Sequence, residues 1–107
     1  MSARYGRKLD VNHAEMVRAL EIFGAAVETI QGATPGTPDL LVRIFGVERT
    51  AEVKPPGKDL NDNQRKWWVR WGREATILRT PADCAALIAE MRGALTRNEV
   101  STTGEAP

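Results

Sequence analysis

The run PDLLVRIFGVERTAEVK, residues 38–54, decides the fold of this chain and carries most of its chemistry. Two strand-like stretches of apolar residues flank a glycine turn, which predicts a β-hairpin. If the hairpin folds symmetrically about the peptide bond between Phe45 and Gly46, the numbers of cross-strand partners sum to 91. Asp39 then faces Glu52, with their Cβ atoms about 4.5–5.5 Å apart.

Two carboxylates in that arrangement repel each other unless something compensates their charge. A divalent cation would do so, and Mg²⁺ prefers few carboxylates together with waters and phosphate oxygens. Lys54 lies two residues after Glu52 and points to the same face of the strand, where its charge suits a nucleophilic water or an oxyanion. The alternative is a solvated surface hairpin. The joint pattern of Pro-Asp, apolar strand, turn and Glu-Val-Lys favours a metal-dependent site that cleaves phosphodiesters.

These motifs, Pro38-Asp39 and Glu52-Val53-Lys54, resemble the PD-(D/E)XK nuclease superfamily in form and spacing. The chain is most similar to the small stand-alone phage and prophage branch, which is related to VRR-NUC nucleases and Holliday-junction resolvases. The resemblance covers residues 10–92. Outside the hairpin it rests on Asn12, Glu15, the loop 32–37 and the segment 60–67.

The resemblance implies an α/β fold with a restriction-endonuclease-like αβββαβα core, a mixed four-stranded sheet flanked by helices. Hydrophobic periodicity and turn signals predict the same order. The expected elements are a helix at 13–23, a strand at 25–30, the hairpin at 38–54, a helix at 61–72, a strand at 75–79 and a helix from 81 to about 95. The expected organisation is a basic N-terminal arm (1–9), a nuclease domain (10–95) and a disordered tail (96–107).

The site residues follow from the same resemblance. It implies catalytic roles for Asp39, Glu52, Lys54 and Gln64. It also implies Mg²⁺, replaceable by Mn²⁺, held by Asp39, Glu52, the backbone carbonyl of Val53 and Glu15.

Two of these residues have a simpler alternative role. Asn12 and Glu15 have the spacing of a capping box, in which Glu15 would only stabilise the start of the first helix. Asn61 and Gln64 have the same spacing at the second helix. His13 has no partner in the sequence and is not assigned as a base.

The second helix is rich in tryptophan. Trp67, Trp68 and Trp71 share a helical face with Gln64. Core packing is the favoured role for Trp67 or Trp68 and for Trp71. The remaining ring is available for a dimer interface or for stacking on an unpaired base.

The net charge is only +1, but the positive charges are clustered. Residues 1–8 and 63–73 contain basic residues and no acidic one. Such clusters can contact phosphates, although most charge runs are solvated helix faces. The expected nucleic-acid contacts are Arg4, Arg7, Lys8, Lys58, Arg65 and Lys66.

The expected function is a Mg²⁺-dependent DNA endonuclease, selective for branched or otherwise structured DNA, in phage replication or recombination. A homodimer in the cytoplasm is expected, with no membrane segment. The single cysteine, Cys84, excludes an internal disulfide and predicts a packing residue. The alternatives are a catalytically inactive DNA-binding module with this fold and a nuclease that acts on RNA.

Overall fold

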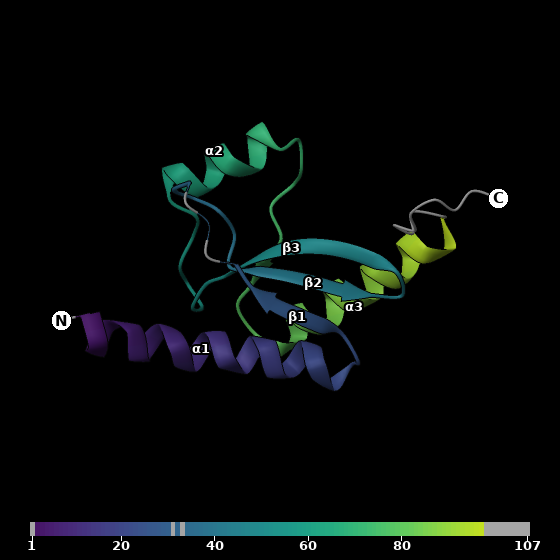
Figure 1. Ribbon diagram of the computed structural model, residues 1–107, viewed down its shortest axis with the longest axis horizontal. Helices are drawn as coiled ribbons and strands as arrows, with labels where there is room; N and C mark the ends of the chain where they lie inside the picture. Colours follow the sequence, from purple (N-terminus) through teal and green to yellow (C-terminus); the bar gives the residue numbers. More distant parts are fainter. Residues whose placement is uncertain (1, 31, 33, 98–107) are drawn as a thin grey trace.

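The computed structural model describes residues 2–30, 32 and 34–97, and for residues 2–10 it describes the backbone alone. The predicted tail therefore lies outside the described residues from position 98 onward. The chain is an α/β protein whose elements follow the predicted αβββαβα order (Figure 1). They are α1 (Ser2–Ile22), β1 (Ala26–Thr29), β2 (Leu40–Ile44), β3 (Val47–Val53), α2 (Asp62–Arg70), β4 (Ile77–Leu78) and α3 (Pro81–Thr96).

The hairpin of β2 and β3 has the predicted register. Its ladder starts with Leu40 opposite Ala51, and all its partner numbers sum to 91. Phe45 and Gly46 form the turn with φ angles of 59° and 75°. Two positive φ angles are typical of a type I′ turn, whose twist matches that of the strands it joins. The guanidinium carbon of Arg92, on α3, lies 4.4 Å from the centroid of the Phe45 ring and covers it.

The four strands form one mixed sheet in the order β1-β2-β3-β4. Strand β2 is antiparallel to both β1 and β3, whereas β4 is parallel to β3. A parallel pair requires a crossover connection, and α2 lies within it (Figure 1).

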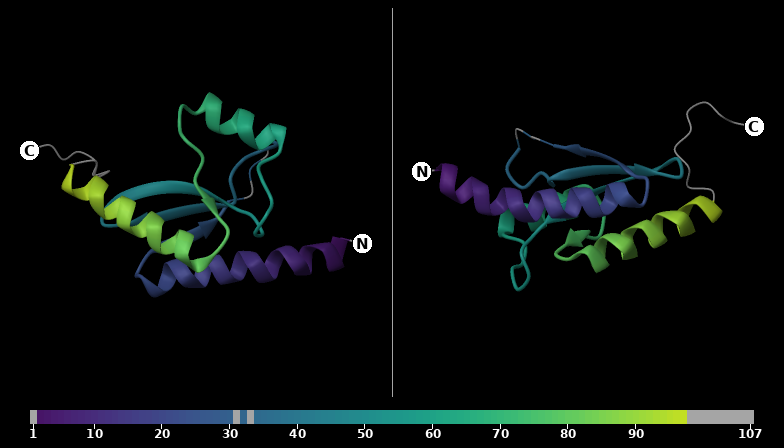
Figure 2. Two further views of the ribbon diagram at one scale, coloured as in Figure 1. Left: turned by 180° about the vertical axis from the view of Figure 1, so that it is seen from behind. Right: turned by 90° about the horizontal axis from the view of Figure 1, so that it is seen from below.

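The main core lies between the sheet and two helices. Helices α1 and α3 contact each other and the strands, and Figure 2 shows both on one side of the sheet. Side chains alternate along each strand, so Val47 and Ala51 of β3 are buried in this core. By the same alternation Glu52 belongs to the opposite face. Glu52 is thus directed away from the main core.

Helix α2 stands beyond one end of the sheet, apart from α1 and α3 (Figures 1 and 2). It has its own small cluster, in which Trp67 and Trp68 are buried with Leu60 and pack against Ile77. The prediction that Trp71 is a core residue is wrong, because 58% of its surface is exposed. Trp71 is the C-cap of the helix, one turn after Trp67.

The first helix begins earlier than predicted. Helix α1 runs from Ser2 through Asn12, so the predicted start at His13 and the capping box of Asn12 with Glu15 are both wrong. The residues predicted as a basic arm contain no proline and include alanine, leucine, arginine and lysine, which favour continued helix. A residue inside a helix cannot cap it.

The other two helix starts are as predicted. Asn61 and Gln64 form a capping box at α2, and Thr80 and Asp83 form one at α3. Cys84 is fully buried, which confirms its predicted packing role. Across the described part of the chain, no helix combines the length and the apolar character needed to cross a bilayer.

Candidate active site

Asp39 links the start of β2 to the end of β3. Its Oδ2 atom accepts a hydrogen bond of 2.9 Å from the backbone N–H of Val53. Its backbone carbonyl accepts another, of 2.7 Å, from the N–H of Ile30. The preceding Pro38 is fully buried and fixes the entry of the chain. The Asp39 carboxylate is therefore held by the end of β3, and the Asp39 backbone by the residue after β1.

Glu52 is the buried acid of the site, with only 3% of its surface exposed. Its Oε2 atom accepts a hydrogen bond of 2.9 Å from the side-chain amide of Gln64. Its Oε1 atom is also buried, and no described residue donates a hydrogen bond to it. A buried carboxylate oxygen without a donor is costly and calls for a proton or a cation.

The protonation of Glu52 reflects this environment. Burial, together with charge repulsion from the neighbouring Asp39, raises the pKa of Glu52 from 4.5 to about 8. The charge of Lys54 opposes this rise in pKa. The charge repulsion indicates that the two carboxyl groups are neighbours, as the hairpin register predicts.

Lys54 is fixed at the end of β3 by the parallel strand. Its backbone N–H donates to the carbonyl of Leu78 at 3.1 Å, and the N–H of Glu52 donates to the carbonyl of Thr76 at 2.8 Å. Side chains two residues apart on a strand share a face, and the effect of Lys54 on the pKa of Glu52 agrees with that placement. The site therefore combines the carboxyl groups of Asp39 and Glu52 with the positive charge of Lys54.

Gln64 caps α2, as its spacing from Asn61 predicts, and also contacts Glu52. Its carbonyl oxygen accepts from the backbone N–H of Asn61 at 2.8 Å, which completes the cap of α2. Its amide group simultaneously donates to Glu52. A Cβ added at Gly36 would clash with the backbone carbonyl of Asn63, so the preceding loop packs tightly on the same helix end. The N-terminal end of α2 is therefore held against the acid pair.

Glu15 is not part of this group. It is exposed on α1, and its charge acts on Cys84 of α3, where burial, Asp83 and Glu15 raise the pKa of the thiol to about 11. The described residues contain no group of three or more His, Cys, Asp and Glu side chains that could hold a metal. The structure brings together two of the three predicted carboxylates.

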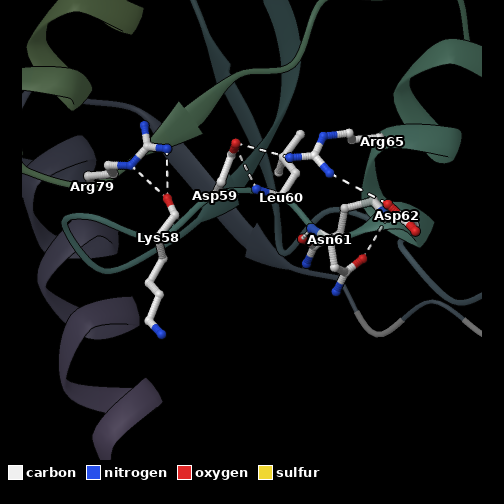
Figure 3. A network of polar contacts seen from close by, with 8 residues as sticks. Lys58, Asp59, Leu60, Asn61, Asp62, Arg65 and Arg79 are labelled. Atoms are coloured by element: carbon white, nitrogen blue, oxygen red, sulfur yellow. Dashed lines mark hydrogen bonds and ion pairs between the residues drawn. The ribbon is translucent and has the colours of Figure 1, made fainter.

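The basic residues near the site differ in their availability (Figure 3). Arg65 forms ion pairs with Asp59 at 3.0 Å and Asp62 at 3.6 Å, so part of its charge is already compensated. The Lys58 side chain is exposed and extends away from these contacts. Lys66 is also exposed. The predicted contacts Arg4, Arg7 and Lys8 have side chains outside the described part of the chain.

Sequence reasoning missed Arg79. Its guanidinium group donates two hydrogen bonds, of 3.1 and 2.7 Å, to the backbone carbonyl of Lys58 (Figure 3). This fixes the connection between the end of β3 and α2. No motif marks Arg79, because the interaction joins a side chain to a backbone group 21 residues away.

A cavity of about 740 Å³ opens beside Asp39. Its lining includes Asn12 and His13 of α1, Thr29 of β1, and Val53. The His13 Nε2 atom lies 3.0 Å from the Thr29 hydroxyl, a partner that the sequence did not reveal. Of the acid pair, Asp39 lines the cavity, which provides room for a ligand next to this carboxylate.

The donor set fits a hard divalent cation. Mg²⁺ binds through one or two carboxylates and completes its shell with waters and phosphate oxygens. Asp39 and Glu52 supply the two carboxylates, and the orphaned Oε1 atom of Glu52 is the best evidence that the pair is built to hold a positive charge.

Comparisons with known proteins add no relative. No family model matches the chain, and neither the curated proteins nor the solved structures contain a match.

Proposed function

We propose that the chain is a Mg²⁺-dependent nuclease that hydrolyses phosphodiester bonds in DNA. The single observation that carries this proposal is the close pair of Asp39 and Glu52, one of them buried with a raised pKa, beside the cation of Lys54. A buried acid beside a second carboxylate destabilises a protein unless it serves a purpose, and acids with perturbed pKa values are typical of catalytic sites.

The fold supports the same proposal. The order and pairing of the strands, with an antiparallel hairpin followed by a parallel fourth strand, are those that the restriction-endonuclease-like core would require. We therefore propose that the α/β domain is a small member of the PD-(D/E)XK superfamily, with its site at the end of β3. Because fold alone does not fix function, the residues of the site carry the argument.

Each residue has a definable role in hydrolysis. Asp39 and Glu52 hold the cation, and the backbone carbonyl of Val53 would complete the protein ligands. When bound, Mg²⁺ polarises the scissile phosphate and acidifies the attacking water. Lys54 orients that water or stabilises the charge that develops on phosphorus-bound oxygens. Gln64 fixes the rotamer of Glu52 through its 2.9 Å hydrogen bond.

The substrate is proposed to be branched or otherwise structured DNA. The described chain has one small domain and no separate recognition module, so contacts to phosphates and to DNA shape are more suitable than base readout. A homodimer would place two such sites for paired cuts across a junction. A cytoplasmic setting in phage replication or recombination belongs to the same proposal.

The test is cleavage of labelled four-way junction, flap, duplex and single-stranded DNA with Mg²⁺ or Mn²⁺. Asp39→Asn and Lys54→Met should each lower the rate by roughly 100-fold or more. Glu48→Gln is the matched control, because Glu48 is an exposed acid on the same strand, paired with Arg43 at 2.7 Å. Binding without cleavage in either metal would instead favour a DNA-binding module, and preference for RNA would favour the RNA nuclease.

A further inference from the structure

We infer that the outer surface of α2 binds an unpaired nucleotide of the substrate, with its base stacked on Trp71. This inference rests on the proposed function and specifies its substrate: DNA that has an unpaired base close to the cut. It starts from the finding that Trp71 is a large aromatic ring left 58% exposed.

The exposed ring is held in a fixed orientation. Trp71 stacks on Trp67 with ring centroids 5.2 Å apart and an interplanar angle of 20°. Trp67 is itself fixed by an edge-on contact with Trp68, with centroids 5.0 Å apart. Because Trp71 is already stacked on Trp67, its exposed surface should lose little side-chain entropy on binding, which suits a stacking platform.

Positive charge flanks this platform on the same helix. Lys66 and Arg70 are four residues apart, as are Trp67 and Trp71, so the basic pair forms a row beside the aromatic pair. Both basic side chains are exposed, and neither takes part in an ion pair within the described part of the chain. Arg65, in contrast, is paired with two acids. Phosphates are the complementary partner of such a row.

A groove of about 580 Å³ runs along this row. Pro35 and Asn63 form one part of its lining, and Lys66, Trp67 and Arg70 form another. An aromatic surface with adjacent cations and a groove for the backbone is the general arrangement of single-strand binding sites. Stacking tolerates any base, so this surface would recognise that a base is unpaired rather than which base it is.

The position on the helix relates the platform to the acid pair. Gln64, which contacts Glu52, and Trp71 are seven residues apart on α2, or about 10 Å along the helix axis. That distance equals about three stacked nucleotides at 3.4 Å each. The unpaired nucleotide should therefore lie within about three nucleotides of the scissile phosphate.

The test measures binding without metal, so that it does not depend on cleavage. Fluorescence anisotropy would compare the full chain and its Trp71→Ala variant on a single-stranded oligonucleotide, a flapped duplex and a blunt duplex. The variant should bind the first two roughly 10-fold more weakly and the blunt duplex within about 2-fold of the original chain. Trp71→Phe, which keeps an aromatic ring, should recover most of the loss.

Phe23→Ala is the matched control, since Phe23 is an aromatic side chain 49% exposed at the end of α1 and does not line the groove beside α2. It should leave all three affinities unchanged. An equal effect of Trp71→Ala on all three DNAs, or no effect, would overturn the inference. Loss of a dimer in sedimentation of Trp71→Ala, with equal losses on every DNA, would also overturn it and assign the surface to a homodimer interface.

The outcomes distinguish the two proposals. If Asp39→Asn retains the preference for unpaired DNA but no variant or metal gives cleavage, the nuclease proposal fails and the platform stands. If cleavage depends on Asp39 while Trp71→Ala binds every DNA normally, the platform fails and the nuclease stands.

Discussion

Gln64 donates its side-chain amide to Glu52 at 2.9 Å while its carbonyl oxygen caps the helix that carries it. One side chain therefore couples the start of α2 to the buried acid of the candidate site. The orientation of the helix and that of the carboxylate are fixed together, and a change at Gln64 should affect both stability and metal-dependent activity.

Gln64→Ala should destabilise the fold by about 1–2 kcal/mol, because it removes a capping interaction and leaves Glu52 Oε2 without a donor. Urea unfolding and cleavage rates would measure the two effects. Asp83→Ala is the matched control, since Asp83 completes the other capping box at α3. It should reduce stability similarly with little effect on the rate measured under conditions where the protein is folded. Equal effects of both substitutions on the rate would contradict a role for Gln64 in the site.

The raised pKa of Glu52 predicts how stability depends on pH without metal. Between pH 4.5 and about 8 the folded chain keeps the Glu52 proton, whereas the unfolded chain loses it. The unfolded state then binds fewer protons, so this group makes the free energy of unfolding fall as pH rises through that window. The slope should be at most about 1.4 kcal/mol per pH unit.

Glu52→Gln should remove this dependence, so its stability advantage over the original chain grows from pH 5 to pH 8 and then levels off. Urea unfolding in a chelating buffer at pH 5, 7 and 9 would measure it. The free energy of unfolding of Glu48→Gln should differ from that of the original chain by a constant amount over the same range, because Glu48 is exposed. A parallel pH dependence of the original chain and Glu52→Gln would show that Glu52 ionises normally.

Cation binding should release a proton below pH 8, since the cation competes with the proton on Glu52. Mg²⁺ should therefore raise the melting temperature more at pH 8 than at pH 6. Differential scanning fluorimetry with Mg²⁺ and with chelator would measure this shift. Asp39→Asn should abolish it, whereas Glu48→Gln should retain it. A shift that survives Asp39→Asn would place the cation elsewhere.

Gly36→Ala should destabilise the chain by more than about 2 kcal/mol, because φ is +92° and the new Cβ would meet the Asn63 carbonyl. Gly57 also has a positive φ, of +85°, but a Cβ there would meet nothing within 4 Å. Gly57→Ala should therefore cost only about 1–2 kcal/mol. Thermal or urea unfolding of the two variants would separate the contact from the backbone conformation, and equal losses would argue against tight packing of the loop on α2.

The features that depend on residues close together in the chain, such as turns and helix caps, could be predicted from the sequence. The register of the hairpin followed from the position of Gly46, and the caps at Asn61 and Thr80 followed from residue types and spacing. From this register the closeness of Asp39 and Glu52 could be derived. The order of the predicted elements placed a helix between the third and fourth strands, and the structure has α2 in this position.

The remaining features depend on three-dimensional packing. Asn12 has the residue type and spacing of a cap, but the helix continues through it to Ser2. Trp71 has the periodicity of a core residue, but it lies outside the cluster of Leu60, Trp67 and Trp68 and is exposed. The contact of Arg79 with the Lys58 carbonyl involves a backbone group, which leaves no mark in the sequence. Pattern alone could not decide any of these.

The separate position of α2 has a consequence for how such a protein can diversify. Gln64, Trp67 and Trp68 anchor the helix through one side, whereas Lys66, Val69 and Arg70 on its other surface are exposed. Mutations on the exposed surface leave the acid pair and the main core untouched. Single substitutions on this nine-residue helix could thus replace one set of contacts with a ligand by another. Directed evolution could alter ligand selectivity at this surface with little loss of stability.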